Sequence, residues 1–340
     1  MNVLISNSWN RFLEKFPSEN KDIYFSEEYV KLYERDSKAC CCIVEEKGKL
    51  LLMPFLKRSF GSYFDFETPY GYGGPIVNTN DINWSRLALT EIKKKLEKER
   101  YICGFLRFHP LLNNASVYRE VMNILDDRFT VSIDLVPQEE EIWNNQITSK
   151  NRNMIRKAEK SGLKFEIDED FSHLADFKLL YNKTMEYLGA ETFYFFDDKY
   201  YDEFKKNLSN NSFLGLVRKN DGEIVSAAIF MYNGYYGHYH LAGSNREFSS
   251  LGMNNLMLWE AAKELKRRNI KLFHLGGGTD GSEENSLFKF KKSFSNHLKQ
   301  FSIGTVIFNE AAYTEICLEW ERKNPNKKEK YKNYLLKYRY

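Results

Sequence analysis

The sequence lacks the features that mark disulfide-stabilised and metal-binding proteins. It has only five cysteines, an odd number, and three of them are consecutive, Cys40 to Cys42. Because neighbouring residues of a strand point to opposite faces, this run does not have the ligand spacing of a zinc site. Buried thiols in a reducing compartment are the expected state, and we predict no bound metal.

Signals for export and for membrane insertion are also missing. No apolar run reaches the length of about 18 residues that a membrane-spanning helix needs. The N-terminus has neither the basic segment nor the long apolar segment of a signal peptide. Lys and Arg number 50 against 47 Asp and Glu, a net charge of +3, so the charge identifies no partner. We therefore expect a cytoplasmic protein without a transmembrane segment.

The sequence does contain enough apolar material for two folded domains. Hydrophobic residues make up 42% of its 340 residues and aromatic residues 16%, which excludes a disordered chain. The hydrophobic periodicity predicts the same order of elements in both halves: two helices, a β-meander, a long helix, a strand, a short helix and a final strand. The order repeats although the residues do not, which indicates two copies of one α+β unit. We place the copies at residues 1–148 and 149–322, followed by a basic tail at 323–340.

The clearest functional pattern lies near the C-terminal end. A short buried strand, Leu272–Leu275, runs into three glycines, Gly276, Gly277 and Gly278, and a helix with the sequence Leu-Phe-Lys-Phe-Lys-Lys-Ser-Phe follows at 287–294. Glycines have no Cβ, so the backbone can turn sharply and another molecule can lie against it. A strand that enters a glycine turn before a cationic helix is where α/β proteins bind anionic ligands. A plain turn with solvated lysines is the alternative, and the Phe-Lys pattern favours function.

A basic helix is predicted at 149–161, at the start of the second half. Arg152 and Arg156 lie four positions apart, so one face of this helix presents two guanidinium groups. They could bind the phosphates of a tRNA end, a CoA or a nucleotide sugar. The alternative is an ordinary solvated face, and the sequence does not decide between the two.

Two further groups of side chains are candidates for the site. In the predicted strand 235–242, alternation places Tyr236, His238 and His240 on one face, where a histidine could take a proton from an amine at neutral pH. A hydrogen-bonded structural histidine is the alternative. In the glycine-rich loop 68–76, Tyr70 and Tyr72 could form a wall against which a sugar or base stacks, or the loop could simply be a rigid turn.

The C-terminal tail is strongly basic. From Lys323 to Tyr340 it carries six lysines and one arginine, opposed only by Glu329. It could contact nucleic acid or, peripherally, anionic lipid head groups. We predict a frayed, solvated end.

Three stretches make the chain similar to the Fem peptidyltransferase group, which pairs two GNAT-like domains. They are the basic helix Lys150–Leu163, the turn His274–Gly278 together with the Phe-Lys segment 287–294, and the Pro69–Pro75 loop. The resemblance implies an α+β fold of two tandem GNAT-like domains. It also implies transfer of an amino acid from aminoacyl-tRNA to an amine of a peptidoglycan precursor, whereas related enzymes use acyl-CoA and acylate amino sugars. No permanently bound cofactor is implied.

The resemblance also implies roles for individual residues. Lys291 matches the lysine of the group's Phe-Lys pair, so it is the expected electrostatic stabiliser of the donor's reacting ester or thioester, with Phe290 as a wall of the site. Lys31 is a candidate contact to the acceptor in the first domain. In the loop that binds acyl-CoA in GNAT enzymes, only Gly252 fits the usual pattern. Asn254 stands where a small residue is expected, which favours aminoacyl-tRNA as the donor.

These observations predict an acyltransferase that joins an aminoacyl or acyl group to an amine of a cell-envelope precursor, a peptidoglycan or surface-polysaccharide intermediate. Its partners would be this precursor and, if aminoacyl-tRNA is the donor, tRNA. One alternative is an acetyl-CoA-dependent N-acetyltransferase that acts on a nucleotide-linked amino sugar. A second is a precursor-binding protein without catalytic activity.

Overall fold

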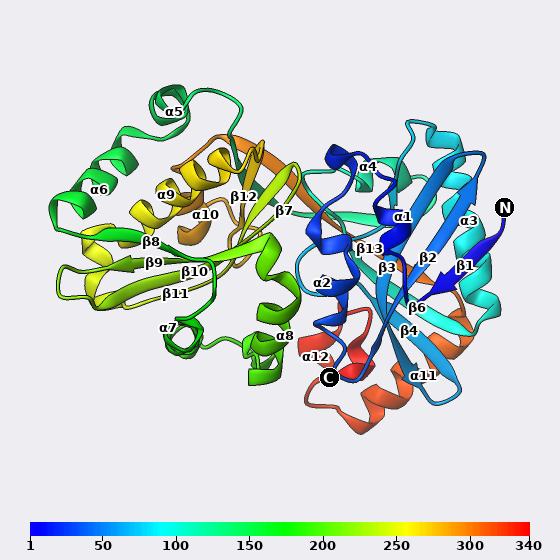
Figure 1. Cartoon of the computed structure of the whole chain (residues 1–340). Helices are drawn as coiled ribbons and strands as arrows, with labels where there is room; N and C mark the ends of the chain where they lie inside the picture. The colour runs from blue at the N-terminus through cyan, green and yellow to red at the C-terminus, as the bar shows by residue number, and fades with distance from the viewer. The chain divides into compact units, whose positions relative to one another are not determined.

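The computed structural model describes residues 1–340, which form two compact units (Figure 1). The first unit consists of Met1–Asp127 and Gln300–Tyr340, and the second of Arg128–Lys299. Two long strands, β7 (Asn123–Asp134) and β13 (His297–Ile307), each begin in one unit and continue in the other.

The sheet of the first unit has the strand order β1-β2-β3-β4-β6-β13, with β5 added beside β3. Neighbouring strands in this order are antiparallel, as are β3 and β5, except β4 and β6, which are parallel. The strands that lie wholly in this unit are β1 (Val3–Ser6), β2 (Lys38–Glu46), β3 (Lys49–Phe60), β4 (Tyr63–Glu67), β5 (Ile76–Val77) and β6 (Tyr101–Arg107).

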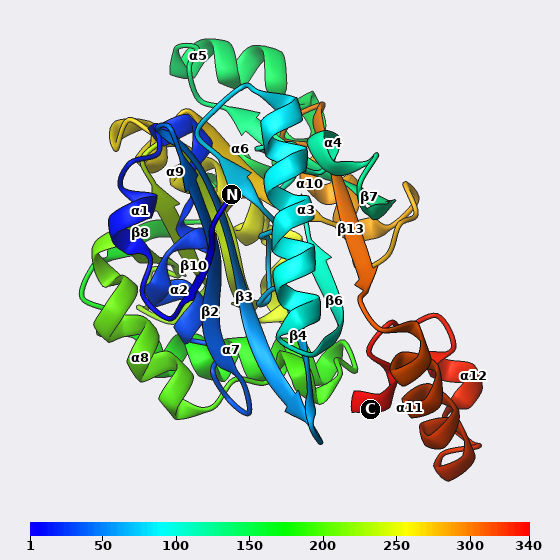
Figure 2. The same ribbon diagram turned by 90° about the vertical axis from the view of Figure 1, so that its right-hand side faces the viewer.

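The long helix of the first unit, α3, connects the parallel strands β4 and β6 and lies along the sheet (Figure 2). Its buried residues recur at helical spacing and pack on the core of β2, β3 and β6. The helices of this unit are α1 (Asn10–Leu13), α2 (Glu27–Lys31), α3 (Ile82–Lys98), α4 (Ala115–Tyr118), α11 (Glu310–Lys323) and α12 (Lys328–Tyr331), with short 3₁₀ turns η1 (Ser18–Asn20), η2 (Ile23–Phe25) and η7 (Lys337–Arg339).

The sheet of the second unit has the strand order β7-β12-β11-β10-β9-β8. Its strands β11 and β12 are parallel, and the other neighbours are antiparallel. The remaining strands are β8 (Lys164–Asp168), β9 (Ser212–Arg218), β10 (Ile224–Asn233), β11 (Tyr236–Ser244) and β12 (Leu272–Gly277).

Helices cover both faces of this second sheet. Helices α6 and α9 pack together over one face, and α7 packs on β10 and β11 from the other (Figure 1). The helices are α5 (Glu139–Glu141), α6 (Ser149–Lys160), α7 (Leu174–Tyr187), α8 (Asp198–Leu208), α9 (Met253–Arg267) and α10 (Ser286–Lys292), with a π-helical turn η3 (Ile142–Gln146) and 3₁₀ turns η4 (Thr192–Tyr194), η5 (Ser209–Asn211) and η6 (Arg246–Leu251). No helix in either unit combines the length and the apolar character that crossing a bilayer requires.

The predicted duplication of one α+β unit is confirmed. Each copy runs strand, two helices, three antiparallel strands, a long helix, a parallel strand, a short helix and a last strand. The last strands are exchanged, however. β7 ends the first copy but pairs through Thr130–Asp134 with β12, and β13 ends the second copy but pairs through Ile303–Ile307 with β6.

The exchange of last strands moves the unit boundaries away from the predicted domain boundaries. The sequence placed the division at 148/149 and a separate tail at 323–340, whereas the compact units divide at 127/128 and 299/300. A strand belongs to the sheet that satisfies its backbone hydrogen bonds, and the chain order of the elements does not reveal that partner.

The C-terminal tail is folded onto the first unit, so the prediction of a frayed end is wrong. The hydroxyl of Tyr338 and the Nε atom of Arg339 both donate to Oδ2 of Asp65, at 2.8 and 2.9 Å. Arg58 donates to the other carboxylate oxygen at 3.1 Å. Asp65 is 0% exposed, and a buried carboxylate is stable only when charged and hydrogen-bonding partners surround it.

We expect Asp65→Asn to lower the free energy of unfolding by about 3 kcal/mol, because it removes the buried charge that Arg339 and Arg58 share and leaves Arg58 with Glu67 alone. Urea unfolding at neutral pH measures this loss. The matched control is Glu99→Gln, which breaks an exposed pair with Lys95 and should change stability by less than about 0.5 kcal/mol. Equal stabilities for the two variants would show that the network around Asp65 does not hold the tail in place.

Candidate active site

Strands β11 and β12 of the second unit pair only over their first residues. The parallel register runs from Tyr236 opposite Leu272 to His238 opposite His274 and then ends. Beyond this point β11 remains paired with β10, and β12 remains paired with β7. The two strands therefore diverge, and backbone groups on the facing edge of β11 have no strand partner.

The glycine turn begins where the two strands diverge. The register between β12 and β7 shifts between His274 and Gly276, which marks a bulge, and Gly276 has a left-handed φ of +77°. A Cβ added at Gly277 would lie 2.9 Å from the carbonyl oxygen of Phe129, and one added at Gly278 would lie 2.6 Å from Oδ1 of Asn285. Close neighbours within the protein itself therefore require glycine at these two positions.

Lys291 projects from α10 toward this turn. Its Nζ atom donates to the carbonyl oxygen of Gly277 at 2.8 Å and lies 6.0 Å from the ring centroid of Tyr239, the first residue of β11 beyond the last pair with β12. The residue is only 8% exposed. Loss of hydration disfavours the charged form and lowers the pKa of Lys291 to about 7. An amine in this state changes its charge near physiological pH.

The rest of α10 keeps the other lysines away from this position. Phe288 and Phe294 are buried, and Phe290 is half-buried against Phe294 in an edge-to-face contact with a centroid distance of 5.5 Å. Lys289 and Lys292 pair with the exposed residues Glu284 and Glu283. Phe290 thus packs beside Lys291 on α10, and Lys291 alone among the three lysines is buried.

The predicted histidines lie on the other face of β11. A Cβ on Gly237 would contact Leu265 of α9, whereas the ring of His240 stacks on Phe204 of α8 and its Nε2 atom lies 3.1 Å from the hydroxyl of Tyr200. Desolvation, with a smaller contribution from His238, lowers the pKa of His240 to about 3. The imidazole is therefore neutral near pH 7 and is a weak proton acceptor.

His238 and Tyr236 are both buried in the same strand. The ring of His238 meets that of His274 edge-on at 5.6 Å, in the last register pair of β11 and β12. All three side chains thus lie along one strand and away from Lys291, and a register shift between β10 and β11 next to His240 interrupts the expected alternation.

Helix α9 begins beside the basic helix. Gly252 precedes it with a left-handed φ of +81°, and a Cβ there would lie 2.6 Å from the carbonyl oxygen of Met154 in α6. No side chain caps α9, and its first turn contains no acidic residue. The amide groups of this turn can therefore bind an anion. Asn254 does not fill the space in front of them, because its Oδ1 atom accepts a hydrogen bond from Ser226 of β10 at 2.7 Å.

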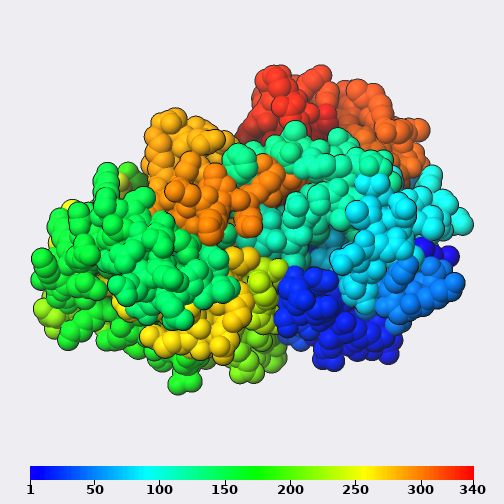
Figure 3. Space-filling model, turned by 90° about the horizontal axis from the view of Figure 1, so that it is seen from above, coloured from blue at the N-terminus to red at the C-terminus, as the bar shows by residue number.

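The basic helix α6 does not present two outward guanidinium groups. Arg152 donates to the carbonyl oxygens of Trp143 and Ile147, so it ties α6 to the preceding turn. Arg156 is exposed and lies over the ring of Trp143 at 5.3 Å. Lys157 reaches the carbonyl oxygen of Ser250, just before α9. The surface of this segment, green in Figure 3, includes cations for which no ion pair with an acidic side chain is found: Lys150, Arg156, Lys157 and Lys160.

The loop with Tyr70 and Tyr72 is held rigidly in the first unit. The hydroxyl of Tyr29 donates to the carbonyl oxygen of Tyr70 at 2.8 Å, and the amide of Asn114 donates to Gly73 and Pro75. Both tyrosines are half-buried, and the ring of Tyr72 lies 5.3 Å from that of Tyr24 in an edge-to-face contact. The loop is a rigid turn that also displays an aromatic surface.

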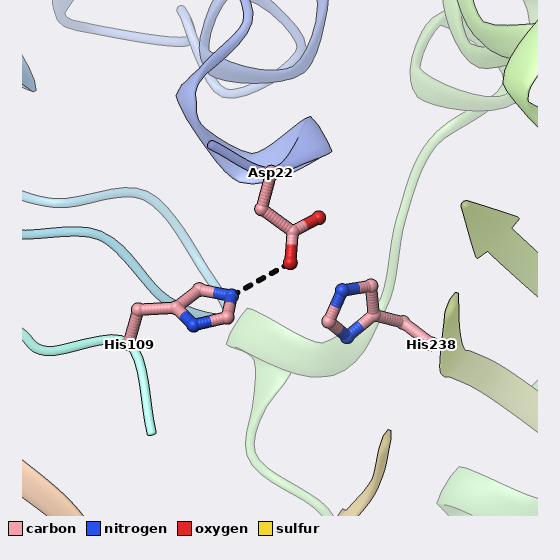
Figure 4. A group of neighbouring side chains, drawn as sticks. All are labelled: Asp22, His109 and His238. Atoms are coloured by element: carbon pink, nitrogen blue, oxygen red, sulfur yellow. Dashed lines mark ion pairs between the residues drawn. The ribbon is translucent and has the colours of Figure 1, made fainter. Parts of the chain in front are cut away.

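Sequence reasoning missed a buried pair in the first unit. Nε2 of His109 lies 2.8 Å from Oδ2 of Asp22, and both side chains are fully buried (Figure 4). The amide of Leu112 donates to Nδ1 of His109, and the amide of Ile23 donates to Oδ1 of Asp22. Because Nδ1 accepts a hydrogen bond, the ring proton lies at Nε2 and faces the carboxylate. No spacing in the sequence connects these two residues.

Lys31 lies at the surface of the first unit. Its Nζ atom pairs with Glu27 one helical turn earlier, at 2.7 Å, and lies 5.9 Å from the ring of Trp9. This pairing is the ordinary arrangement of a lysine near the end of a helix. Each unit therefore contains its own subset of the predicted site residues: Lys31, Tyr70 and Tyr72 in the first, and the remaining candidates in the second.

Comparison with known proteins agrees with this architecture. Residues 148–292 match the family model of the acetyltransferase (GNAT) domain. No curated protein matches the chain by sequence. Among solved structures, FemX superposes with a TM-score of 0.73 at 16% identity, covering 93% of this chain and 100% of that one.

Two further solved structures share the fold. The C-terminal domain of a putative lysylphosphatidylglycerol synthetase from Agrobacterium fabrum has a TM-score of 0.57 at 14% identity, over 90% of this chain and 94% of that one. A tandem GNAT protein from the clavulanic acid biosynthesis pathway has a TM-score of 0.55 at 6% identity, over 91% and 99%. These likenesses confirm the predicted pair of GNAT-like domains. The chain therefore shares the fold of two GNAT-like domains with these proteins, and its residues 148–292 match the acetyltransferase (GNAT) domain family.

Proposed function

We propose that the protein transfers an aminoacyl group from aminoacyl-tRNA to an amine of a cell-envelope precursor in the cytoplasm. The observation that carries this proposal is the position of Lys291 in the GNAT domain. A buried amine with a pKa of about 7 faces the place where β11 and β12 diverge and where the edge of β11 has no strand partner.

The chemistry needs few protein groups. The acceptor nitrogen attacks the carbonyl carbon of the donor ester, a C–N bond forms, and the bond to the ribose oxygen breaks. The nitrogen loses one proton, and the departing oxygen gains one. Negative charge develops on the carbonyl oxygen during the attack, and the ammonium of Lys291 stabilises it most strongly in a site that contains little water. No covalent intermediate on the enzyme is required.

We assign the donor to the second unit because the corresponding helix of the first unit is closed to anions. Helix α3 occupies the place in the first copy that α9 occupies in the second. The carboxylate of Asp81 caps α3 by accepting from the amide of Trp84 at 2.9 Å, and it also binds Lys49. The start of α9 has no such carboxylate. The dipole and free amides of α9 therefore favour donor phosphates in the second unit only.

The exposed cations of α6 favour a nucleic acid as the donor. They extend from Lys150 to Lys160 along a helix that packs against the start of α9, and phosphates of an RNA backbone could bind along this row. The fold is also that of a protein named as a lysylphosphatidylglycerol synthetase, a name that denotes aminoacyl transfer. In the first unit, Tyr70, Tyr72 and Lys31 are the proposed contacts to the acceptor.

A second candidate is acetyl transfer from acetyl-CoA to a nucleotide-linked amino sugar. It is favoured by the uncapped start of α9 and by Gly252, which together suit a pyrophosphate. Asn254 does not oppose it, because that side chain bonds to β10. Incubation of the pure protein with charged tRNA or with acetyl-CoA, plus candidate amines, separates the two functions when the products are read by mass.

With aminoacyl-tRNA as the donor, binding should weaken steeply as salt is added, because phosphate contacts release counterions. We expect a slope of log K against log salt of about −3, from three to four phosphate contacts. Arg156→Gln should reduce the size of this slope by about 1. Arg267→Gln, which removes an exposed cation at the far end of α9, is the control and should leave the slope unchanged. Turnover with acetyl-CoA alone would establish the second candidate instead.

Lys291→Met should reduce kcat by about a hundredfold or more, because about 3 kcal/mol of transition-state stabilisation is lost. The same variant should be more stable than the wild type at pH 7, by about 2 kcal/mol, since the pKa of this buried lysine is lowered by folding and its charging costs free energy. That gain should shrink as the pH rises from 7 toward the unfolded pKa of about 10.4. Lys289→Met, on the exposed side of α10, is the control for both measurements. Near-native turnover of Lys291→Met would exclude this lysine from the chemistry.

Donor binding should be coupled to proton uptake. The pKa of Lys291 is about 7 without ligand, and a nearby anionic or strongly polarised donor raises it. Uptake should therefore be small at pH 6, about half a proton at pH 7 and close to one proton at about pH 8.5. Calorimetric titration with a stable donor analogue in buffers of different ionisation enthalpy measures this number. Lys291→Met should abolish the uptake, and an unchanged value in that variant would place the titrating group elsewhere.

A further inference from the structure

We propose that Asn285 is the positioning residue that joins the glycine turn to α10 and thereby holds Lys291 in place. The inference rests on the proposed function to the extent that Lys291 is the group whose position matters. Nothing in the sequence pattern or in the GNAT match singles out Asn285.

The side-chain oxygen of Asn285 caps the start of α10. Its Oδ1 atom accepts hydrogen bonds from the amides of Leu287 and Phe288, at 3.1 and 3.2 Å. This arrangement satisfies two of the amides that a helix start leaves without a partner. The carbonyl group of Asn285 accepts the amide of Lys289 at 2.9 Å. The direction of a helix as short as α10 therefore depends on this residue.

The side-chain nitrogen of Asn285 binds the turn. Its Nδ2 atom donates to Oγ1 of Thr279 at 2.7 Å and to Oδ2 of Asp280 at 2.9 Å. Hydrogen bonds from the backbone of Ser282 and from Asn285 lower the pKa of Asp280, so its carboxylate is an ionised acceptor. Gly278 lies directly against the amide of Asn285, where no Cβ would fit.

These contacts form a closed loop of interactions that includes Lys291. The chain runs from Gly277 through the turn to Asn285 and then along α10 to Lys291, whose Nζ atom returns to the carbonyl oxygen of Gly277. Asn285 is the only side chain of this segment that bonds to both the turn and the helix. A residue with an acceptor alone could begin the helix, but it could not also donate to Thr279 and Asp280. The amide side chain meets both requirements.

The pKa of Lys291 depends on how well the surrounding groups exclude water. On β11 the nearest group is the phenol of Tyr239, which burial keeps neutral by raising its pKa. On β7, Arg128 donates to the carbonyl oxygen of Gly278. On α10 the neighbouring lysines face outward to glutamates. Burial is the cause of the lowered pKa of Lys291. Loss of the contacts made by Asn285 should admit water and raise this pKa.

The test compares Asn285→Ser with Asn285→Ala in the full-length protein. Serine can still cap α10 but is too short to bridge to Thr279 and Asp280, whereas alanine loses both functions. The pKa of Lys291 is measured by NMR titration of protein labelled with ¹³C at lysine Cε, and the resonance is assigned by its absence in Lys291→Met. We expect both variants to raise this pKa by about one unit or more, and to lower kcat about tenfold with little change in KM.

Asn309→Ala is the matched control, because Asn309 caps α11 of the first unit by accepting from Ala312 at 2.9 Å. It should lose stability as Asn285→Ala does, by about 1 kcal/mol, without shifting the pKa of Lys291. A pKa that stays near 7 in both Asn285 variants would overturn the proposal and leave Asn285 a helix cap only. A raised pKa with unchanged kcat would keep the positioning role and refute the catalytic role of Lys291, so the two failures are distinguishable.

Discussion

The candidate site depends on one buried amine held against one carbonyl group. Burial of Lys291 costs free energy because the ammonium loses water, and the single hydrogen bond to Gly277 only partly compensates for that loss. The structure around it follows from this constraint: a glycine turn tight enough to bring the carbonyl group into reach, a short helix with buried phenylalanines, and an asparagine that joins the two. Buried groups with a strongly shifted pKa are typical of functional sites, and the proposed acyl transfer would use such a lysine where negative charge develops.

The two copies of the unit differ at the start of their long helix, and our proposal for the donor site rests on this difference. Each copy has a long helix that follows three antiparallel strands and precedes a parallel one. In the first copy the carboxylate of Asp81 caps the start of that helix, whereas in the second copy Gly252 precedes the helix and no side chain caps it. The first copy has instead a rigid aromatic loop and a fully buried pair of Asp22 and His109. Duplication thus supplied one scaffold twice, and the helix start decides which copy favours anions.

Contacts that are distant in sequence hold each unit together. Asp65 binds residues at the very end of the chain, and this network explains why a segment with so many lysines is ordered. Basic composition alone suggested a solvated tail, since local charge gives no information about a buried carboxylate elsewhere in the chain. The same holds for Arg152, whose guanidinium binds carbonyl groups of the preceding turn although its spacing from Arg156 suggested a shared outward face.

The sequence by itself determined the order of elements, the duplication and the Phe-Lys segment, because hydrophobic periodicity and glycine positions report local burial and local backbone geometry. Only the tertiary structure decided which sheet each last strand joins, since strand pairing is a choice among distant partners. It also decided the chemistry of individual side chains. The sequence suggested His240 as a proton acceptor at neutral pH and Lys291 as a positive charge, but desolvation lowers the pKa of the first to about 3 and that of the second to about 7. Desolvation depends on what packs around a group in space, and this information is absent from the neighbouring residues in the chain.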